Sequence, residues 1–303
     1  MFKFSKEQAV FEISGVKIGG QPGELPTAMV GSMFYHGHKI VSDEKEGAFD
    51  KKRAEDILNK HEETMEKTGN PGVIDVVGAF PNAIIKYIDY IADKTQQPML
   101  IDGTTSKVRI AALQHLKEVG LADRAIYNSI IPEIKDDEKI ALTESGIKSS
   151  ILLTYNPKKP TLAGRMEVLR GSEGLVNIAK EIGIEKPLVD ATILGVADPG
   201  PVAKAIFLMK EEFGLPGGCG AHNAVDRWHK SKKLDKQTYL VSSVVANITS
   251  IIMGANFMLY GPLAKAEEMF PPFALADAYV AYSMRQEHGI KPLTRNHPLF
   301  KIF

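Results

Sequence analysis

The sequence predicts an α/β protein, a single (β/α)8 TIM barrel preceded by a β-hairpin. Short apolar runs alternate with longer segments of helical periodicity, a pattern typical of parallel strands joined by crossover helices. Eight such pairs fit into about 260 residues, which suits a closed barrel. An open nucleotide-binding sheet is the alternative, but its Gly-rich turn is missing after the first strand.

The strand–helix pairs follow one another along the chain. Strands are expected at residues 28–35, 73–77, 99–102, 125–128, 151–155, 188–190, 217–220 and 257–260. Helices are expected at residues 51–67, 81–94, 107–119, 137–145, 174–182, 201–213, 236–253 and 274–287. Asp50 is the expected N-cap of the first helix, and Gly69 lies just past its end.

A β-hairpin is predicted before the barrel, because residues 10–18 alternate in polarity around Ser14 and Gly15. We expect it to plug the bottom of the barrel. The chain contains no low-complexity tract and no linker, so residues 1–303 are expected to form one domain, with residues 1–24 as hairpin and lead-in.

The composition excludes several classes of partner. Basic and acidic residues balance at 37 each, so the net charge indicates neither a nucleic-acid nor an anionic-membrane partner and leaves open a local basic patch. The single cysteine, Cys219, permits no intrachain disulfide and indicates an intracellular protein. The first residues lack the continuous apolar core of a secretory signal, and the apolar stretch 241–259 is interrupted by Ser, Thr and Asn. We therefore expect a soluble, cytoplasmic protein with a buried helix and strand in that stretch.

Polar side chains end the predicted strands, where barrel enzymes place their catalytic groups. These residues are Ser32, Asp75, Asp102, Asn128, Asn156, Asp190, Asn223 and Tyr260. Carboxylates accept hydrogen bonds from N–H groups, and carboxamides donate and accept at once. The set suits a flat heterocycle with an N–H, an amino group and a carbonyl on one edge, such as a pterin. The alternative for each single Asp or Asn is a helix N-cap or a turn residue.

His36 and His38 follow the first strand, where metal-dependent hydrolase barrels carry a His-x-His zinc pair. Such a site needs further strand-end histidines and an Asp on the last strand, and the eighth strand offers Tyr260. Cys219, between glycines, is expected to be a small buried residue. We expect no metal site, and keep a hydrolase using His36 and His38 as an alternative.

Several segments together resemble the pterin-binding methyltransferase barrels. They are Leu-Ile-Asp-Gly-Thr-Thr-Ser at 100–106, Ala-Ile-Tyr-Asn-Ser at 125–129, Leu-Leu-Thr-Tyr-Asn at 152–156, Leu-Val-Asp at 188–190 and Gly-Cys-Gly-Ala-His-Asn at 218–223. The family resembled is that of the H subunit of tetrahydromethanopterin S-methyltransferase, whose bacterial relatives are methyltetrahydrofolate:corrinoid-protein methyltransferases. Position 103 is Gly, where the family is expected to carry Ser.

The resemblance implies roles for individual residues. Asp102, Asn128 and Asp190 would bind the pterin edge, with Ser129 beside them, and Asn223 would lie near N5 and the transferred methyl group. Asp75 and Asn156 match less securely. The catalytic residues implied are Asn223 and Asp102. No strand-end Lys and Arg pair is found, which argues against a synthase that joins a pterin to aminobenzoate.

The resemblance also implies the reaction. A methyl group would move between N5 of tetrahydrofolate or tetrahydromethanopterin and the cobalt of cobalamin on a separate corrinoid protein. Of the two pterins, tetrahydrofolate is slightly preferred, and the sequence does not fix the direction of transfer. A homodimer is expected, with mobile loops around residues 36–49 and 224–236. A non-catalytic subunit that only docks a corrinoid protein is a further alternative.

Overall fold

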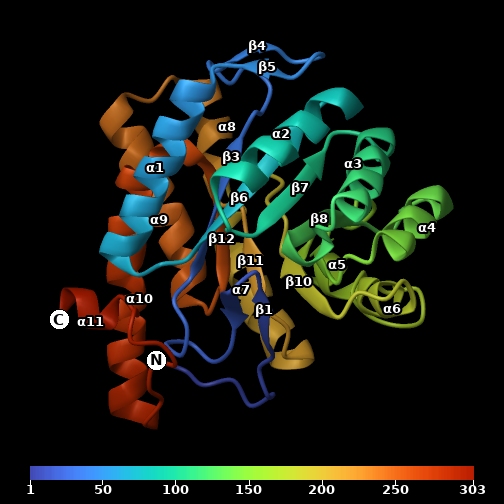
Figure 1. Ribbon diagram of the computed structural model, residues 1–303. Coiled ribbons are helices and arrows are strands. Elements are labelled where there is room, and N and C mark those ends of the chain that lie inside the picture. The colour runs from blue at the N-terminus through green and yellow to red at the C-terminus, as the bar shows by residue number, and fades with distance from the viewer.

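The computed structural model describes residues 1–303 and contains a closed barrel of eight parallel strands, as predicted (Figure 1). Each strand pairs with the next one in the chain, and the last pairs with the first. In chain order they are β3 (Ala28–Met33), β6 (Gly72–Gly78), β7 (Met99–Gly103), β8 (Ala125–Ile130), β9 (Ser149–Leu153), β10 (Lys186–Asp190), β11 (Gly217–Cys219) and β12 (Phe257–Pro262).

Eight principal helices surround the strands, one after each. They are α1 (Lys51–Thr68), α2 (Pro81–Lys94), α3 (Ser106–Glu118), α4 (Asp136–Ser145), α6 (Leu175–Glu181), α7 (Pro199–Phe213), α9 (Lys236–Ile252) and α10 (Ala266–His288). The predicted cap of α1 is confirmed, because Asp50 accepts a hydrogen bond from the backbone N–H of Arg53 at 3.1 Å. Gly69 ends that helix in the left-handed conformation, at φ 85°.

The chain also contains short elements that the sequence analysis did not predict. They are the hairpin β4 (Val41–Asp43) and β5 (Ala48–Phe49), α5 (Leu162–Glu167), α8 (His222–Lys232), α11 (Leu299–Ile302) and the 3₁₀ turns η1 (Ala122–Arg124) and η2 (Leu263–Lys265).

Two boundaries differ from the prediction. The segment expected as a loop at 224–236 is largely the helix α8, because its polar residues include no Gly or Pro and its Ala224 and Val225 pack on the core. The last helix begins at Ala266 rather than at 274, because it continues through Pro271 and Pro272 near its start. Proline disfavours a helix interior, and the predicted helix began after this pair.

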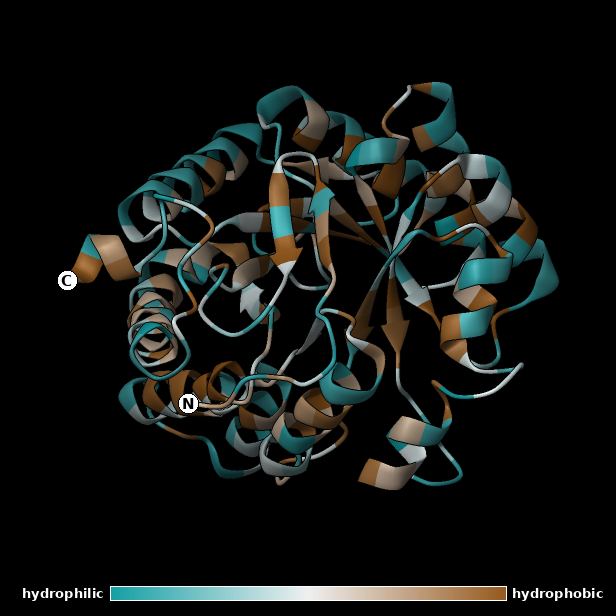
Figure 2. Cartoon of the chain, turned by 90° about the horizontal axis from the view of Figure 1, so that it is seen from below, coloured by the Kyte–Doolittle hydropathy of each residue, from teal (hydrophilic) through white to brown (hydrophobic).

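The N-terminal hairpin closes the barrel at the amino ends of the strands, as expected. It consists of β1 (Val10–Ile13) and β2 (Val16–Gly19), paired antiparallel. Figure 2, viewed from below, shows it lying across that end. The buried Ile13, Val16 and Ile18 join one apolar cluster with the inward side chains of the strands. Burial of these side chains holds the hairpin in place and leaves the opposite end as the mouth.

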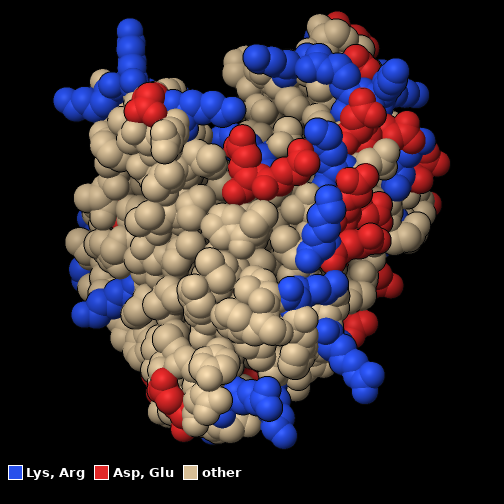
Figure 3. Space-filling view, turned by 90° about the vertical axis from the view of Figure 1, so that its left-hand side faces the viewer, with Lys and Arg blue, Asp and Glu red and all other residues tan.

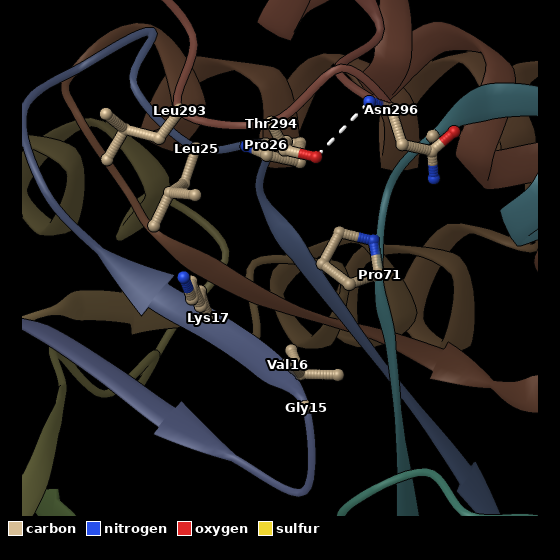
Figure 4. Close-up of a pocket in the computed structure, with 10 residues that line it drawn as sticks. Gly15, Val16, Lys17, Leu25, Pro26, Pro71, Leu293, Thr294 and Asn296 are labelled. Carbon is tan, nitrogen blue, oxygen red and sulfur yellow. Dashed lines mark hydrogen bonds between the residues drawn. The ribbon is translucent and has the colours of Figure 1, made fainter.

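A cavity of about 320 Å³ lies beside this hairpin, at the end of the barrel away from the mouth (Figure 4). Its lining comes from the hairpin, from the chain entering β3 and β6, and from the C-terminal segment: Gly15, Val16, Lys17, Leu25, Pro26, Gly69, Pro71, Leu293, Thr294 and Asn296. No carboxylate lines it. In barrels of this kind the amino ends of the strands serve stability.

The apolar stretch 241–259 divides as predicted, into the end of α9 and the start of β12. No helix combines the length and the apolar character that a membrane span requires.

Candidate active site

Polar side chains form the uppermost inward layer of the barrel. The layer beneath is apolar and includes Val30, Val73, Leu100, Ile126 and Leu188. Side chains two residues apart on a strand share a face, so the next inward positions follow directly. They are Ser32, Asp75, Asp102, Asn128 and Asp190. The structure thus brings the four predicted Asp and Asn residues of these strands to one mouth.

Asp75 is the most deeply buried carboxyl group of this layer, with 3% of its surface exposed. Ser32 Oγ donates a hydrogen bond to its Oδ2 at 2.6 Å, while Oδ1 has no partner. Burial raises the pKa of Asp75 well above its usual range, and the charge of Asp102 raises it further. A buried acceptor without a donor is costly, so Asp75 has unused capacity for a ligand N–H.

Asp102 and Asp190 are the other two carboxyl groups. Burial raises the pKa of each to about 6. At Asp102, the positive charge of Arg109 partly offsets this rise in pKa. At Asp190, a hydrogen bond from the backbone N–H of Thr192, at 2.7 Å, partly offsets the rise. Neither carboxyl group accepts a hydrogen bond from a lysine or arginine. The mouth is therefore suited to N–H donors rather than to an anion.

The loop that follows Asp102 is fixed by Arg109, a residue that the sequence analysis did not single out. Its guanidinium donates to the carbonyl of Gly103 at 2.8 Å and pairs with the buried Glu138. A Cβ on Gly103 would lie 2.6 Å from Cγ of Arg109. The close approach of Arg109 accounts for glycine where the resemblance leads one to expect serine. No hydroxyl is available there to contact a ligand.

The loop that follows Asp190 is fixed by a second arginine that the sequence did not reveal. Arg165 on α5 is buried and donates to the carbonyls of Ala191 at 3.0 Å and Thr192 at 3.1 Å. It also pairs with Asp198 at 3.1 Å. Both arginines stiffen loops next to a carboxyl group of the mouth, and neither hydrogen-bonds to that carboxyl group. They are positioning residues.

The three remaining predicted residues differ in their surroundings. Ser129 follows Asn128 on β8 and is half-buried. Asn156 lies beyond β9, where its Oδ1 accepts from the N–H groups of Lys158 and Lys159 and its Nδ2 donates to the carbonyl of Gly164. Its side chain is thus already paired within its own loop. Asn223 lies in the first turn of α8 and is exposed, and a Cβ on Gly220 would lie 3.0 Å from its Nδ2.

His222 forms part of the mouth wall next to Asn223. Its Nδ1 lies 2.7 Å from the carbonyl oxygen of Leu259. A Cβ added to Gly261 would lie 3.2 Å from Cδ2 of the His222 ring. Burial lowers its pKa, so the imidazole is neutral at neutral pH. The glycines leave space for this ring. No role at the mouth was predicted for His222 from the sequence.

Tyr260 was wrongly predicted to face the mouth. It lies at a register shift between β12 and β3, where two residues of β12 oppose one of β3. It is 1% exposed, and its hydroxyl lies 3.2 Å from Nδ1 of His61 on α1. Its ring therefore packs against the helix layer outside the barrel.

Comparisons with known proteins give the chain its family. The family model of the tetrahydromethanopterin S-methyltransferase MtrH subunit matches residues 6–293. The chain belongs to this family. The H subunit of tetrahydromethanopterin S-methyltransferase from Methanosarcina barkeri is 41% identical over 318 residues, and that from Methanothermobacter thermautotrophicus 39% over 311, each match covering 100% of both chains. The resemblance inferred from the motifs is confirmed, and so is the class of methyltransferase at the level of this family.

Solved structures confirm the barrel fold of this MtrH family member. Dihydropteroate synthase of Yersinia pestis matches with a TM-score of 0.61 and 14% identity, over 89% of this chain and 98% of that one. Dihydropteroate synthase of Xanthomonas albilineans, solved with 7,8-dihydropteroate, matches with a TM-score of 0.62 and 15% identity, over 89% and 98%. At this identity the likeness concerns the fold alone.

The His-x-His pair of this family member is not arranged as a zinc pair. His36 is exposed and pairs with Glu44 at 2.9 Å, whereas His38 is buried and its Nδ1 accepts from the backbone N–H of Phe34 at 3.1 Å. No group of three or more His, Cys, Asp or Glu side chains converges as a metal site would require. Cys219 is buried as expected, with its Sγ 3.4 Å from Oγ of Ser250, and burial raises the pKa of its thiol to about 12.

Proposed function

We propose that this protein moves a methyl group between N5 of a reduced pterin and the cobalt of a corrinoid carried by a separate protein. The observation that carries the proposal is the set of three carboxyl groups in one mouth, of which Asp75 and Asp190 are buried and Asp102 is half-buried, and one of which keeps an unpartnered oxygen. The names of the relatives support a tetrahydropterin substrate and favour tetrahydromethanopterin; tetrahydrofolate is the alternative.

The chemistry of the pterin edge fits this mouth. Its ring N–H and amino groups are donors, which would bind Asp75, Asp102 and Asp190 without a competing cation. The carbonyl beside them is an acceptor, and the carboxamide of Asn128 can donate to it while accepting elsewhere. Ser129 would contribute from its place beside Asn128. Asn156 fits this role less well, because its own loop already uses its side chain.

The difficulty in the reaction is the leaving group. When the N5–methyl bond breaks, its electron pair stays on N5, the methyl group goes to cobalt, and N5 must gain a proton. The reduced corrinoid on the partner supplies the nucleophile. The contribution of this chain is to fix the pterin and to aim the methyl group outward.

Asn223 would act on N5 through hydrogen bonding, directly or through water, because a carboxamide has no useful pKa. Stabilisation of the developing charge would rest on preorganised dipoles. The same geometry serves both directions of transfer.

A homodimer belongs to the same proposal. Apolar side chains lie exposed on one face of α9 and on the neighbouring α10: Val241, Val245, Leu275, Tyr279 and Tyr282. Figure 3 shows a broad uncharged face on this side of the molecule. Contiguous apolar surface of this kind marks an interface, and a second copy of the chain offers the same self-complementary face.

Titration of the purified protein with 5-methyltetrahydrofolate and 5-methyltetrahydromethanopterin tests the function directly. We expect saturable binding of at least one, followed by transfer of the methyl group to free cob(I)alamin, observed as loss of the Co(I) absorbance. Binding of neither pterin contradicts the proposal. Binding without transfer to any corrinoid supports the alternative of a docking subunit.

A further inference from the structure

Two basic side chains lie on the same face of α8 as Asn223. Arg227 and Lys230 follow Asn223 by four and seven residues, and at 3.6 residues per turn all three fall within about 60° of one another around the helix. Helical side chains lean toward the N-terminus of their helix. Arg227 and Lys230 therefore lean toward Asn223 and the mouth.

Neither cation is neutralised within the molecule. Both are exposed, and neither forms an ion pair. The one acid within α8, Asp226, accepts a hydrogen bond from the hydroxyl of Tyr239, to which Lys265 also donates. Figure 3 shows basic side chains gathered at the upper left, where α8 leads into α9. In a chain of zero net charge, this part of the rim is positive.

The chemistry of a pterin relates this surface to the substrate. The side chain of folates and methanopterins is attached at C6, the ring atom adjacent to N5. A residue that faces N5 therefore also faces the point where the tail leaves the ring. Asn223 is the residue expected at N5, so the tail would leave the mouth along the face of α8 that Arg227 and Lys230 occupy.

We propose that Arg227 and Lys230 form a subsite for the anionic tail of the pterin substrate. This inference rests on the proposed function. Folate tails carry glutamate carboxylates, and methanopterin tails carry a phosphodiester as well as carboxylates. Guanidinium and ammonium groups bind either kind of anion. The mouth selects the ring through its carboxyl groups, and α8 selects the tail through its cations.

The test compares four ligands that share the pterin ring and differ in the tail. They are the tail-free 5,6-dimethyltetrahydropterin, 5-methyltetrahydrofolate with one or five glutamates, and 5-methyltetrahydromethanopterin. Affinities are measured by calorimetry for the parent, for the double variant Arg227→Gln/Lys230→Gln, and for Lys232→Gln. Lys232 is an exposed residue nine positions after Asn223 and so projects from the opposite face of α8.

We expect the double variant to bind the tailed ligands with an affinity at least about 5-fold lower than that of the parent at low salt, and with a smaller loss of affinity at high salt. Its affinity for the tail-free pterin should match that of the parent, and Lys232→Gln should bind every ligand as the parent does. A larger effect on the pentaglutamate identifies carboxylates as the anions bound, and a larger effect on methanopterin identifies the phosphodiester.

An equal loss for tailed and tail-free ligands, or no loss for any, overturns the subsite while the proposed function stands. If the parent binds none of the four ligands, the proposed function fails first, and the subsite fails with it.

Discussion

Asp75 and Asp102 lie on neighbouring strands and on the same inner face of the barrel, and the charge of Asp102 raises the pKa of Asp75. Two buried carboxyl groups this close are costly to ionise together. The surrounding structure provides Asp75 with one donor, Ser32, and provides Asp102 with the nearby charge of Arg109. The pair is better satisfied by a ligand with adjacent N–H groups than by the protein alone.

Removal of a carboxyl group should therefore cost ligand affinity. For Asp102→Ala and Asp190→Ala we expect pterin affinity to fall about 10- to 100-fold each, because each loses a hydrogen bond to a charged acceptor. Calorimetric titration measures this effect. Ile140→Glu, a change on the outer helix α4, serves as a control and should bind normally. Parent-like affinity in both Asp variants would show that the site assignment is wrong while leaving the fold intact.

The same burial makes stability depend on pH in a defined direction. Because the pKa of Asp190 rises from 3.8 to about 6 on folding, the parent loses stability as pH increases across that window. Asp190→Asn removes this loss, so the variant should be more stable than the parent by about 3 kcal/mol at pH 7 and by little at pH 4. Thermal unfolding at both pH values measures the difference.

Asp235→Asn is the matched control, since the pKa of this exposed N-cap is lowered by its bonds to Thr238. It should lose stability at neutral pH rather than gain it. If Asp190→Asn gains the same stability over the parent at pH 4 as at pH 7, the gain does not come from removing the ionisation of Asp190.

The sequence predicted the barrel and much of its mouth because both depend on periodic features. The inward direction of Asp75, Asp102, Asn128 and Asp190 follows from strand alternation and from strand ends that apolar runs reveal. Tyr260 was misplaced because a bulge interrupts that alternation, and nothing local in the sequence marks the bulge.

The residues that position the mouth were harder to predict, because their contacts join distant segments. Arg109 on α3 pairs with Glu138 on α4, and Arg165 on α5 contacts Ala191 and Asp198 in the loop that follows the neighbouring strand β10. No spacing rule links such pairs. The helix α8 was missed for another reason: its polar sequence resembles a solvated loop, and its short apolar face packs only through Ala224 and Val225.

The two asparagines beyond the strand ends should behave differently when altered. For Asn223→Ala we expect methyl transfer to slow at least about 10-fold with pterin affinity nearly kept, because the group that faces N5 is lost. For Asn156→Ala we expect a loss of stability of about 1 kcal/mol, because three loop hydrogen bonds disappear. Single-turnover kinetics and thermal unfolding separate the two effects. If both variants transfer the methyl group at the same rate, Asn223 has no role in the reaction.

The exposed apolar face of α9 and α10 should control the oligomeric state. Val245 is 60% exposed and Tyr279 56%. In a dimer formed through this face, Val245→Glu/Tyr279→Glu would bury charges without partners, which is strongly unfavourable. We expect light scattering at about 10 µM to report a dimer for the parent and a mass of 33.2 kDa for the double variant. Ile140→Glu, at a site 59% exposed on another face, should remain dimeric. A monomeric parent, or a double variant that stays dimeric, would rule out this face as the dimer interface.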